Sequence, residues 1–336
     1  MECNETNEPV FVTGFIDRGE KRMQRIRKAV LALLLIWVFC MPQVPTASAE
    51  TIYAKDQEEI VRPYSVYKQW FRLRTEFRDQ GRKIKYSSDT PKVRVSPMGK
   101  VTIGKEFIGT ATITVEAAET ETEAAETMMV QVTVQAPMVG EQELYQSYMT
   151  ENPRYKENRP LRPKGLMLHS VNCPQPSAMA FIERWNDPEY VRASIHAFID
   201  ADSGIVYQAL PWTTRANHCW KGPKGCGNDS YIGVEMCESP NIYWLDRDTI
   251  ECYDDVEAMA AVERTYESAV QLFAMLCVHF DLDPLEDGVV LSHHEGFVRG
   301  IASDHGDPEN LWKAMGTDYT MDGFRKDVSE AMKNYE

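Results

Sequence analysis

The sequence predicts a multi-domain chain, with a small all-β sandwich over residues 50–138 followed by an α/β domain over residues 141–336. From about Gln69 to Val134, short runs alternate apolar with polar residues, and turn-forming residues separate them. After Pro137–Glu143, strand-like runs alternate with runs whose apolar residues recur every three or four positions. At 336 residues and 43% hydrophobic content, the chain is long enough for two cores and a targeting segment.

Residues 1–49 have the pattern of a secretory signal peptide. Basic residues between Lys21 and Lys28 precede the apolar run Ala29–Met41, and Ala47-Ser48-Ala49 supplies an Ala-x-Ala cleavage site. The apolar run is too short to span a bilayer comfortably. We therefore expect export, with no stable membrane insertion after cleavage. An uncleaved N-terminal anchor is the alternative.

The next region is predicted to consist of short strands. Glu50–Tyr67 is charged, without clear periodicity, and is interpreted as a linker or a short leading strand. Glu116–Thr127 alternates Ala, Glu and Thr and is predicted to be a solvated acidic loop between two strands. Several short strands with turns between them indicate a small β-sandwich. The predicted strands are Val93–Val95, Lys100–Ile103, Ala111–Val115 and Met129–Val134.

Three segments of this region are similar to the bacterial immunoglobulin-like domains of surface and secreted proteins. They are Lys85-Tyr86-Ser87-Ser88-Asp89, Gly99-Lys100-Val101 and Gly109-Thr110-Ala111-Thr112-Ile113. The resemblance implies an Ig-like sandwich. Because no catalytic constellation lies in it, a spacer role is preferred to a wall-contacting one.

The α/β domain is predicted from alternating strands and helices that form a mixed central sheet flanked by helices. Ser177 is a plausible N-cap for the first helix, and Asp254 or Asp255 for the long amphipathic one. The predicted elements are a strand at Leu166–His169, a helix at Ser177–Trp185, a hairpin of Ile195–Ile199 and Ile205–Gln208, a buried strand at Ile232–Cys237, a helix at Val256–Phe280 and a strand at Val289–Leu291.

Net charge and cysteine content restrict the partners and the redox chemistry. The formal charge of −15 argues against nucleic-acid binding through a basic face and against broad attraction to anionic wall polymers, although a local basic patch is compatible with it, for instance around Lys221 and Lys224. Cleavage after Ala49 leaves six cysteines, among which Cys219 and Cys226 are the best candidate disulfide pair.

The stretch Ser292–Pro308 contains three histidines, two aspartates and one glutamate. Imidazole nitrogens and carboxylate oxygens suit a catalytic zinc, which takes three protein ligands and leaves one position open. His169 ends the apolar run Gly165–Leu168 and is well placed to supply a distant ligand. A histidine-rich surface loop is the alternative interpretation.

Here the sequence resembles the zinc-dependent N-acetylmuramoyl-L-alanine amidases of type 2, which have the peptidoglycan-recognition-protein fold. The resemblance spans roughly Glu141 to Asp327. It implies Zn2+ as cofactor and peptidoglycan as substrate. The matching segments, in addition to Ser292–Pro308, are Gly165–Ser170, Ser194–Ile199, Leu210–Trp212, Asn217–Cys219 and Tyr231–Glu238.

The resemblance carries the family's metal ligands onto His169, His293 and Asp307. His293 is preferred to His294 because the matching pattern is Ser-His-x-Glu-Gly, and Asp307 because the family's ligand directly precedes a proline. His305 then falls where the family has a Lys or His that stabilises the oxyanion, so it is assigned a catalytic role. An exchange of roles between His305 and Asp307 is the alternative.

Glu235 is the candidate general base. It lies in an otherwise apolar strand, where a buried carboxylate is usually paired with a cation. The resemblance instead implies that Glu235 takes a proton from zinc-activated water and passes it to the leaving amine. Burial should raise its pKa. Glu238 and Glu295 are alternative bases.

The resemblance also implies that His196 and His218 either line the substrate cleft or orient the zinc ligands. Together with Trp212 and Asn217, they are the candidate substrate-binding residues. The chain departs from the family here, because Asn217-His218-Cys219-Trp220 stands where Trp-His-Cys-Gly is expected. This departure affects the wall of the substrate cleft.

The predicted function is that of a secreted, wall-associated peptidoglycan hydrolase, which cleaves the amide bond between N-acetylmuramic acid and L-alanine. A non-hydrolytic peptidoglycan-binding module of the same fold is the main rival. The presence of all three candidate zinc ligands favours hydrolysis. A surface adhesin whose function is carried by residues 50–138 is a third possibility.

Overall fold

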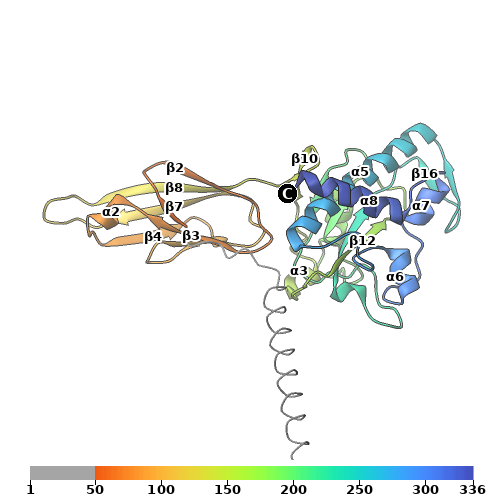
Figure 1. The fold of residues 1–336 in the computed structure, drawn as a ribbon, viewed down its shortest axis with the longest axis horizontal. Coiled ribbons are helices and arrows are strands. Elements are labelled where there is room, and N and C mark those ends of the chain that lie inside the picture. Colours follow the sequence, from red (N-terminus) through yellow and green to blue (C-terminus); the bar gives the residue numbers. More distant parts are fainter. Residues whose placement is uncertain (1–49, 336) are drawn as a thin grey trace, which may run out of the picture. The chain divides into compact units, whose positions relative to one another are not determined.

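The computed structural model describes residues 50–335 (Figure 1). Residues 1–49, for which the sequence predicts a signal peptide, lie outside the described residues. Within residues 50–335, no helix has both the length and the apolar character needed to cross a membrane.

Residues 51–134 form two four-stranded sheets (Figure 1). The first has the order β1 (Thr51–Tyr53), β3 (Gln69–Arg74), β6 (Lys100–Ile103) and β5 (Val93–Val95). The second has the order β2 (Glu58–Arg62), β8 (Glu126–Val134), β7 (Gly109–Ala117) and β4 (Ile84–Ser88). Buried and exposed residues alternate along β7 and β8, so one face of their sheet is buried and the other faces solvent. The short helix α2 (Glu76–Asp79) follows β3.

The four runs predicted as strands in this region correspond to β5, β6, β7 and β8. Residues 118–125 of the acidic run join β7 to β8 and are exposed, whereas the ends of the run belong to the two strands. The segment Glu50–Tyr67 contains two strands rather than a linker or one short strand. Because β1 pairs in parallel with β3 and β2 with β8, partners distant in sequence hold both strands. The assignment of this all-β region to the immunoglobulin-like class stays a prediction.

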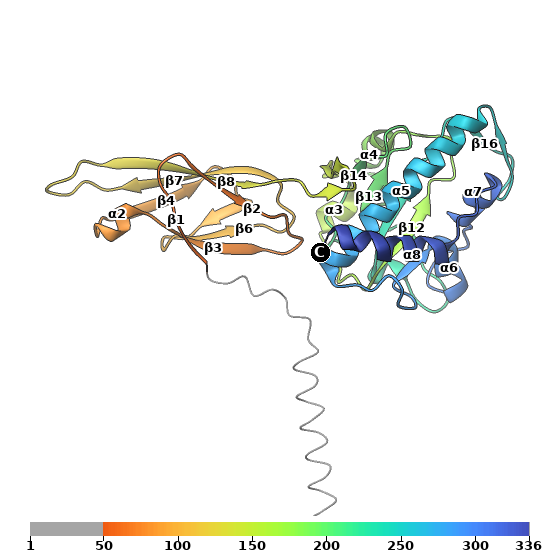
Figure 2. The ribbon, with the colours of Figure 1, turned by 45° about the horizontal axis from the view of Figure 1, so that its top comes forward.

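The C-terminal region contains a six-stranded mixed sheet with helices packed on it (Figure 2), as expected for the predicted α/β domain. Strands β13 and β14 are antiparallel, and the other neighbouring strands are parallel. The order is β11 (Tyr145–Gln146), β14 (Val206–Gln208), β13 (Ala197–Ile199), β15 (Tyr231–Met236), β12 (Gly165–Ser170) and β18 (Val290–Ser292).

Helix α5 contacts β13 and β15, and α8 lies beside α5 and contacts β18 (Figure 2). The helices of this region are α3 (Pro153–Glu157), α4 (Ala178–Trp185), α5 (Asp255–Phe280), α6 (His293–Arg299), α7 (Glu309–Ala314) and α8 (Met321–Ala331). The region also contains two small hairpins, β9 (Met138–Val139) with β10 (Gln142–Glu143) and β16 (Ile242–Trp244) with β17 (Ile250–Cys252). Two 3-10 turns lie at Gly227–Asp229 and Met332–Asn334.

The helix caps follow the expected chemistry. Ser177 accepts a hydrogen bond from the Ala180 amide at the start of α4, and Asp254 accepts from two amides at the start of α5. Ser292 and Glu295 form a capping box at the start of α6. Helix α6 begins at His293, directly after β18, and it was not among the predicted elements.

All six cysteines in the described part of the chain are free thiols. The predicted Cys219–Cys226 disulfide is therefore absent. Both thiols instead contact the carbonyl oxygen of Trp220, at 3.6 Å from Cys219 Sγ and 3.0 Å from Cys226 Sγ.

Candidate metal centre

Three neighbouring parallel strands bring the candidate catalytic residues to one edge of the sheet. Strand β12 lies between β15 and β18, and His169 on β12 is in register with Glu235 on β15. Leu168 is in register with Ser292 on β18, so His293 follows directly beyond the end of that strand. Because the carboxyl ends of parallel strands meet at the same edge, residues far apart in sequence become neighbours there.

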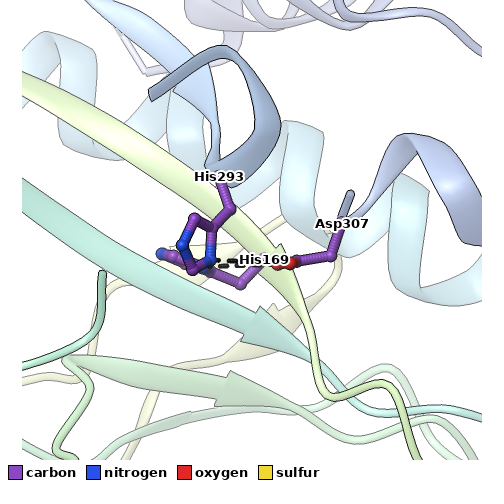
Figure 3. Close-up of side chains that lie close together, drawn as sticks. All are labelled: His169, His293 and Asp307. Atoms are coloured by element: carbon purple, nitrogen blue, oxygen red, sulfur yellow. Dashed lines mark hydrogen bonds and ion pairs between the residues drawn. The ribbon is translucent and has the colours of Figure 1, made fainter. Parts of the chain in front are cut away.

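His169, His293 and Asp307 form a compact buried cluster (Figure 3). His169 Nδ1 lies 3.0 Å from His293 Nδ1 and 3.4 Å from Asp307 Oδ2, and His293 Nδ1 lies 3.5 Å from Asp307 Oδ1. One ligand atom from each residue lies within 4.8 Å of the other two. The Ser170 amide donates to Asp307 Oδ2 at 3.3 Å and orients the carboxylate.

The hydrogen bonds of His218 assign the tautomer of His169. His218 Nε2–H donates to the carbonyl oxygen of Tyr231 at 3.2 Å, which leaves His218 Nδ1 as an acceptor. That acceptor lies 2.9 Å from His169 Nε2, so His169 carries its proton on Nε2. Its Nδ1 lone pair consequently points into the cluster.

A second chain of hydrogen bonds assigns the tautomer of His293. The Ser303 hydroxyl donates to the carbonyl oxygen of Cys219 at 3.4 Å, and it accepts from His293 Nε2–H at 3.3 Å. His293 Nδ1 therefore also presents a lone pair to the cluster. Such contacts at the second ring nitrogen are the usual way in which proteins orient metal-binding histidines.

The electrostatics of the cluster fit a bound cation. Burial lowers the pKa of His169 to about 4, so its ring is neutral at physiological pH. Burial alone would raise the pKa of Asp307, but the neighbouring imidazoles of His169, His293 and His305 outweigh it and hold that pKa well below its ordinary value. Asp307 Oδ1 has no hydrogen-bond partner although it is buried. Two imidazole lone pairs and a carboxylate that converge in a buried space repel one another unless a cation lies between them.

Glu235 meets the requirements for a proton carrier beside this cluster. Its Oε2 is buried and makes no hydrogen bond, and no cation pairs with it among residues 50–335. Burial raises its pKa well above the ordinary value, and the negative charges of Asp307 and Glu238 add to this rise. The direction of the shift agrees with the one expected from the sequence.

His305 lies at the rim of the cluster. Its side chain is about half exposed, its Nδ1 is 3.4 Å from Asp307 Oδ1, and its ring stacks on that of His293 at 4.2 Å. The contact with Asp307 raises the pKa of His305. Asp307, and not His305, is the third member of the buried cluster, whereas His294 contacts the carbonyl oxygen of His305.

Two of the predicted substrate-binding residues are in the core. His196 is fully buried, and both of its ring nitrogens are occupied, since Nδ1 accepts from the Gly233 amide and Nε2–H donates to Thr214 O. Trp212 is also fully buried, and its indole N–H donates to the Tyr64 hydroxyl. Neither side chain reaches the surface, so their burial does not support a contact with substrate, and this role stays a prediction.

The other two predicted substrate-binding residues have structural partners. The side chain of Asn217 donates to the carbonyl oxygen of Arg192 and accepts from Asn228. His218 orients His169, as described above. Of the alternative bases, Glu295 caps α6 and pairs with Arg325 at 2.9 Å, while Glu238 accepts from the indole N–H of Trp244 at 2.7 Å.

Sequence reasoning missed Ser303 and the carbonyl oxygen of Tyr231. No sequence pattern identifies a backbone carbonyl as a histidine partner. The position of Ser303, two residues before His305 in the histidine-rich stretch, was the only available signal.

We expect replacement of His218 by leucine to weaken metal binding about 10- to 100-fold, because His169 then loses the acceptor that fixes its tautomer. Competition with a chromophoric chelator measures the affinity. His279→Leu removes a partly buried histidine elsewhere and should leave the affinity for the metal unchanged. His218→Gln, which retains an acceptor, should recover part of the loss. Equal affinities for the wild type and His218→Leu would contradict the proposed orientation.

Glu238 should make the stability of the metal-depleted protein depend on pH. Burial raises its pKa to about 7, so its contribution to stability is present below pH 4.5 and is lost as the pH rises through 7. As the pH rises from 4.5 to 8, the free energy of unfolding of Glu238→Gln should increase relative to that of the wild type by up to about 3 kcal/mol. Urea unfolding across this range measures the difference between the two proteins. A difference independent of pH would show that Glu238 is not the titrating group.

Comparisons with known proteins place this centre in a family context. Residues 159–310 match the family described as Amidase_2, N-acetylmuramoyl-L-alanine amidase. No curated protein matches the chain.

Among solved structures, similar chains include a mutant endolysin from Bacillus subtilis (18% identity, TM-score 0.38, covering 55% of this chain and 98% of that one). The catalytic domain of XlyA is similar as well (18% identity, TM-score 0.39, covering 56% and 99%). The cysteine protease inhibitor EhICP2 from Entamoeba histolytica matches a smaller part (11% identity, TM-score 0.17, covering 26% and 94%). At these identities and TM-scores the likenesses carry no argument about function. The family match is independent of these structures. It covers residues 159–310, which contain all three members of the buried cluster, and the family is that of the type 2 N-acetylmuramoyl-L-alanine amidases.

Proposed function

We propose that this chain is an exported zinc amidase that cleaves the bond between the lactyl group of N-acetylmuramic acid and L-alanine in peptidoglycan. One observation carries the proposal. Two imidazole lone pairs and one carboxylate converge beside a glutamate whose Oε2 is buried and unpaired, within a segment that matches the amidase family.

His169, His293 and Asp307 are the proposed ligands of the zinc ion. Two neutral nitrogens and one carboxylate are the donor set of many catalytic zinc sites. When bound, zinc supplies Lewis acidity, which polarises a carbonyl group and makes water more acidic. The other steps depend on the side chains around it.

Glu235 is the proposed general base and acid. Its unpaired Oε2 accepts a proton from the attacking water and later donates that proton to the amine of the departing L-alanine. A raised pKa suits the base, because the carboxylate then takes the proton from water more readily than it would at its ordinary, lower pKa. The carboxyl group then holds this proton until the departing amine accepts it. The proposed role of His305, whose imidazole is half exposed at the rim, is to donate a hydrogen bond to the carbonyl oxygen as negative charge develops there.

The remaining features extend the proposal to the whole chain. Residues 1–49 would direct export, residues 50–138 would form an Ig-like domain, and residues 141–336 would form the amidase domain. The expected location is outside the cell, in association with the wall.

The test is to incubate the purified chain, loaded with zinc, with insoluble peptidoglycan. We expect new L-alanine amino termini, with no increase in reducing sugar ends, and loss of this activity when a chelator removes the metal. If the protein binds muropeptides and no wall preparation yields new amino termini, it is a recognition module and the amidase proposal fails.

A further inference from the structure

One outer face of the all-β region is cationic, although the chain as a whole is strongly acidic. In the sheet β1-β3-β6-β5, buried and exposed residues alternate, which places every second side chain on the solvent side. We name the set formed by Trp70, Arg72, Arg94 and Lys100 on this side the cationic face. The three basic residues are exposed, and Trp70 is half-buried among them.

The strand register brings these side chains together. Arg72 on β3 lies directly opposite Lys100 on β6, and Thr102 lies between Trp70 on β3 and Arg94 on β5. Neighbouring strands are about 4.8 Å apart, so Arg72 and Lys100 are close neighbours on the surface. Like charges directly opposite each other destabilise a sheet. The stability of the sheet therefore does not explain why Arg72 and Lys100 stand opposite each other.

The charges of this face are not neutralised within the described residues. Arg72, Arg94 and Lys100 form no ion pair with any residue between 50 and 335, and the neighbouring Arg74 pairs with Asp79 at 2.6 Å. The Nζ atom of Lys100 instead lies 4.3 Å from the centre of the Trp70 ring. This cation–π contact leaves the charge of Lys100 available to a ligand.

The outer face of the second sheet differs in chemistry. There, the outward positions of β7 and β8 are occupied mainly by neutral polar residues, and the exposed Lys85 pairs with Glu116 at 2.9 Å. The positive charge is therefore concentrated on one of two otherwise comparable surfaces. A local cationic surface with an aromatic ring can bind a linear polyanion even when the net charge of the protein is −15.

We propose that the cationic face binds an anionic polymer of the cell wall, one whose repeating groups are phosphates or carboxylates. This gives the all-β region a wall-binding role in place of the spacer role expected from the sequence. A local basic surface of this kind is compatible with the net negative charge of the chain. The proposal rests on the proposed function only for the location of the polymer, since the surface lies outside the candidate metal centre.

The test is co-sedimentation of the full chain with insoluble walls, before and after hydrofluoric acid removes phosphate-linked polymers. The face variant is Arg72→Gln/Arg94→Gln/Lys100→Gln. The control, Lys83→Gln/Lys164→Gln/Lys326→Gln, removes the same charge from exposed positions that form no ion pair within residues 50–335. We expect the face variant to bind untreated walls at least about tenfold more weakly than the wild type, with a smaller dependence on salt, and the control to bind normally.

Binding that disappears with acid treatment identifies phosphate as the anion, whereas salt-sensitive binding that survives identifies the carboxylates. Equal binding by the face variant and the wild type would overturn the proposal. So would equally tight binding of the wild type to duplex DNA, which would show a general polyanion surface. Cleavage of a soluble muropeptide, measured on the same samples, should be unchanged in both variants. If the wild type does not cleave the muropeptide, the proposed amidase function fails, while the proposal for the cationic face is unaffected.

Discussion

Replacement of Glu235 by glutamine should lower kcat of amide cleavage by about 10²- to 10⁴-fold while the metal content stays at the wild-type value. Glutamine has nearly the same shape as glutamate but cannot take the proton from water or return it to the amine. Because Glu235 is not one of the three clustered donors, its loss leaves the metal ligands in place. Initial rates on a soluble muropeptide, with metal analysis of the same sample, measure both quantities.

Glu238→Gln is the matched control for this experiment. Glu238 is buried two residues beyond the end of β15, where it accepts hydrogen bonds from the indole N–H of Trp244 and from the Asn172 amide. Its variant should retain most of the activity. If Glu238→Gln were inactive and Glu235→Gln active, the two carboxylates would have the opposite roles.

Replacement of His293 by alanine should remove both the metal and the activity. The site then retains one imidazole and one carboxylate. A loss of about a quarter of a binding free energy of ~10–16 kcal/mol lowers the affinity for zinc by about 10²- to 10³-fold. Equilibrium dialysis against zinc measures this loss, and the rate of amide cleavage should fall to the level of the chelated wild type.

His294→Ala provides an adjacent control. His294 is the next residue of α6, but its Nδ1 contacts the carbonyl oxygen of His305 and not the cluster. Its variant should bind zinc normally. A zinc-loaded, active His293→Ala protein would contradict the assignment of His293 as a ligand.

Local sequence patterns were sufficient for the elements whose stabilisation is local. The recurrence of apolar residues and the capping aspartate predicted α5 within one residue of its start, because cap hydrogen bonds and one buried face are encoded over short distances. Strands β1 and β2 were not predicted as separate elements from the sequence, since their parallel partners lie about 20 and 70 residues further along the chain.

The sequence by itself determined the residue types of the candidate centre, since the motifs around His169, His293 and Asp307 carry the family resemblance and the structure brings these three together. Only the tertiary structure decided how they are oriented. The His218 acceptor and the Ser303 hydroxyl fix both imidazole tautomers, and they do so through carbonyl groups that no side-chain pattern reveals.

The same distinction explains the burial of two predicted substrate-binding residues and the presence of the cationic face. His196 and Trp212 matched cleft positions in the sequence, yet packing buried them, because burial depends on which segments cover a side chain. Net charge is a sum over the chain and predicted no anion-binding surface. The register of three strands placed Arg72, Arg94 and Lys100 on one side of a sheet, and such clustering is a property of the folded surface and not of composition.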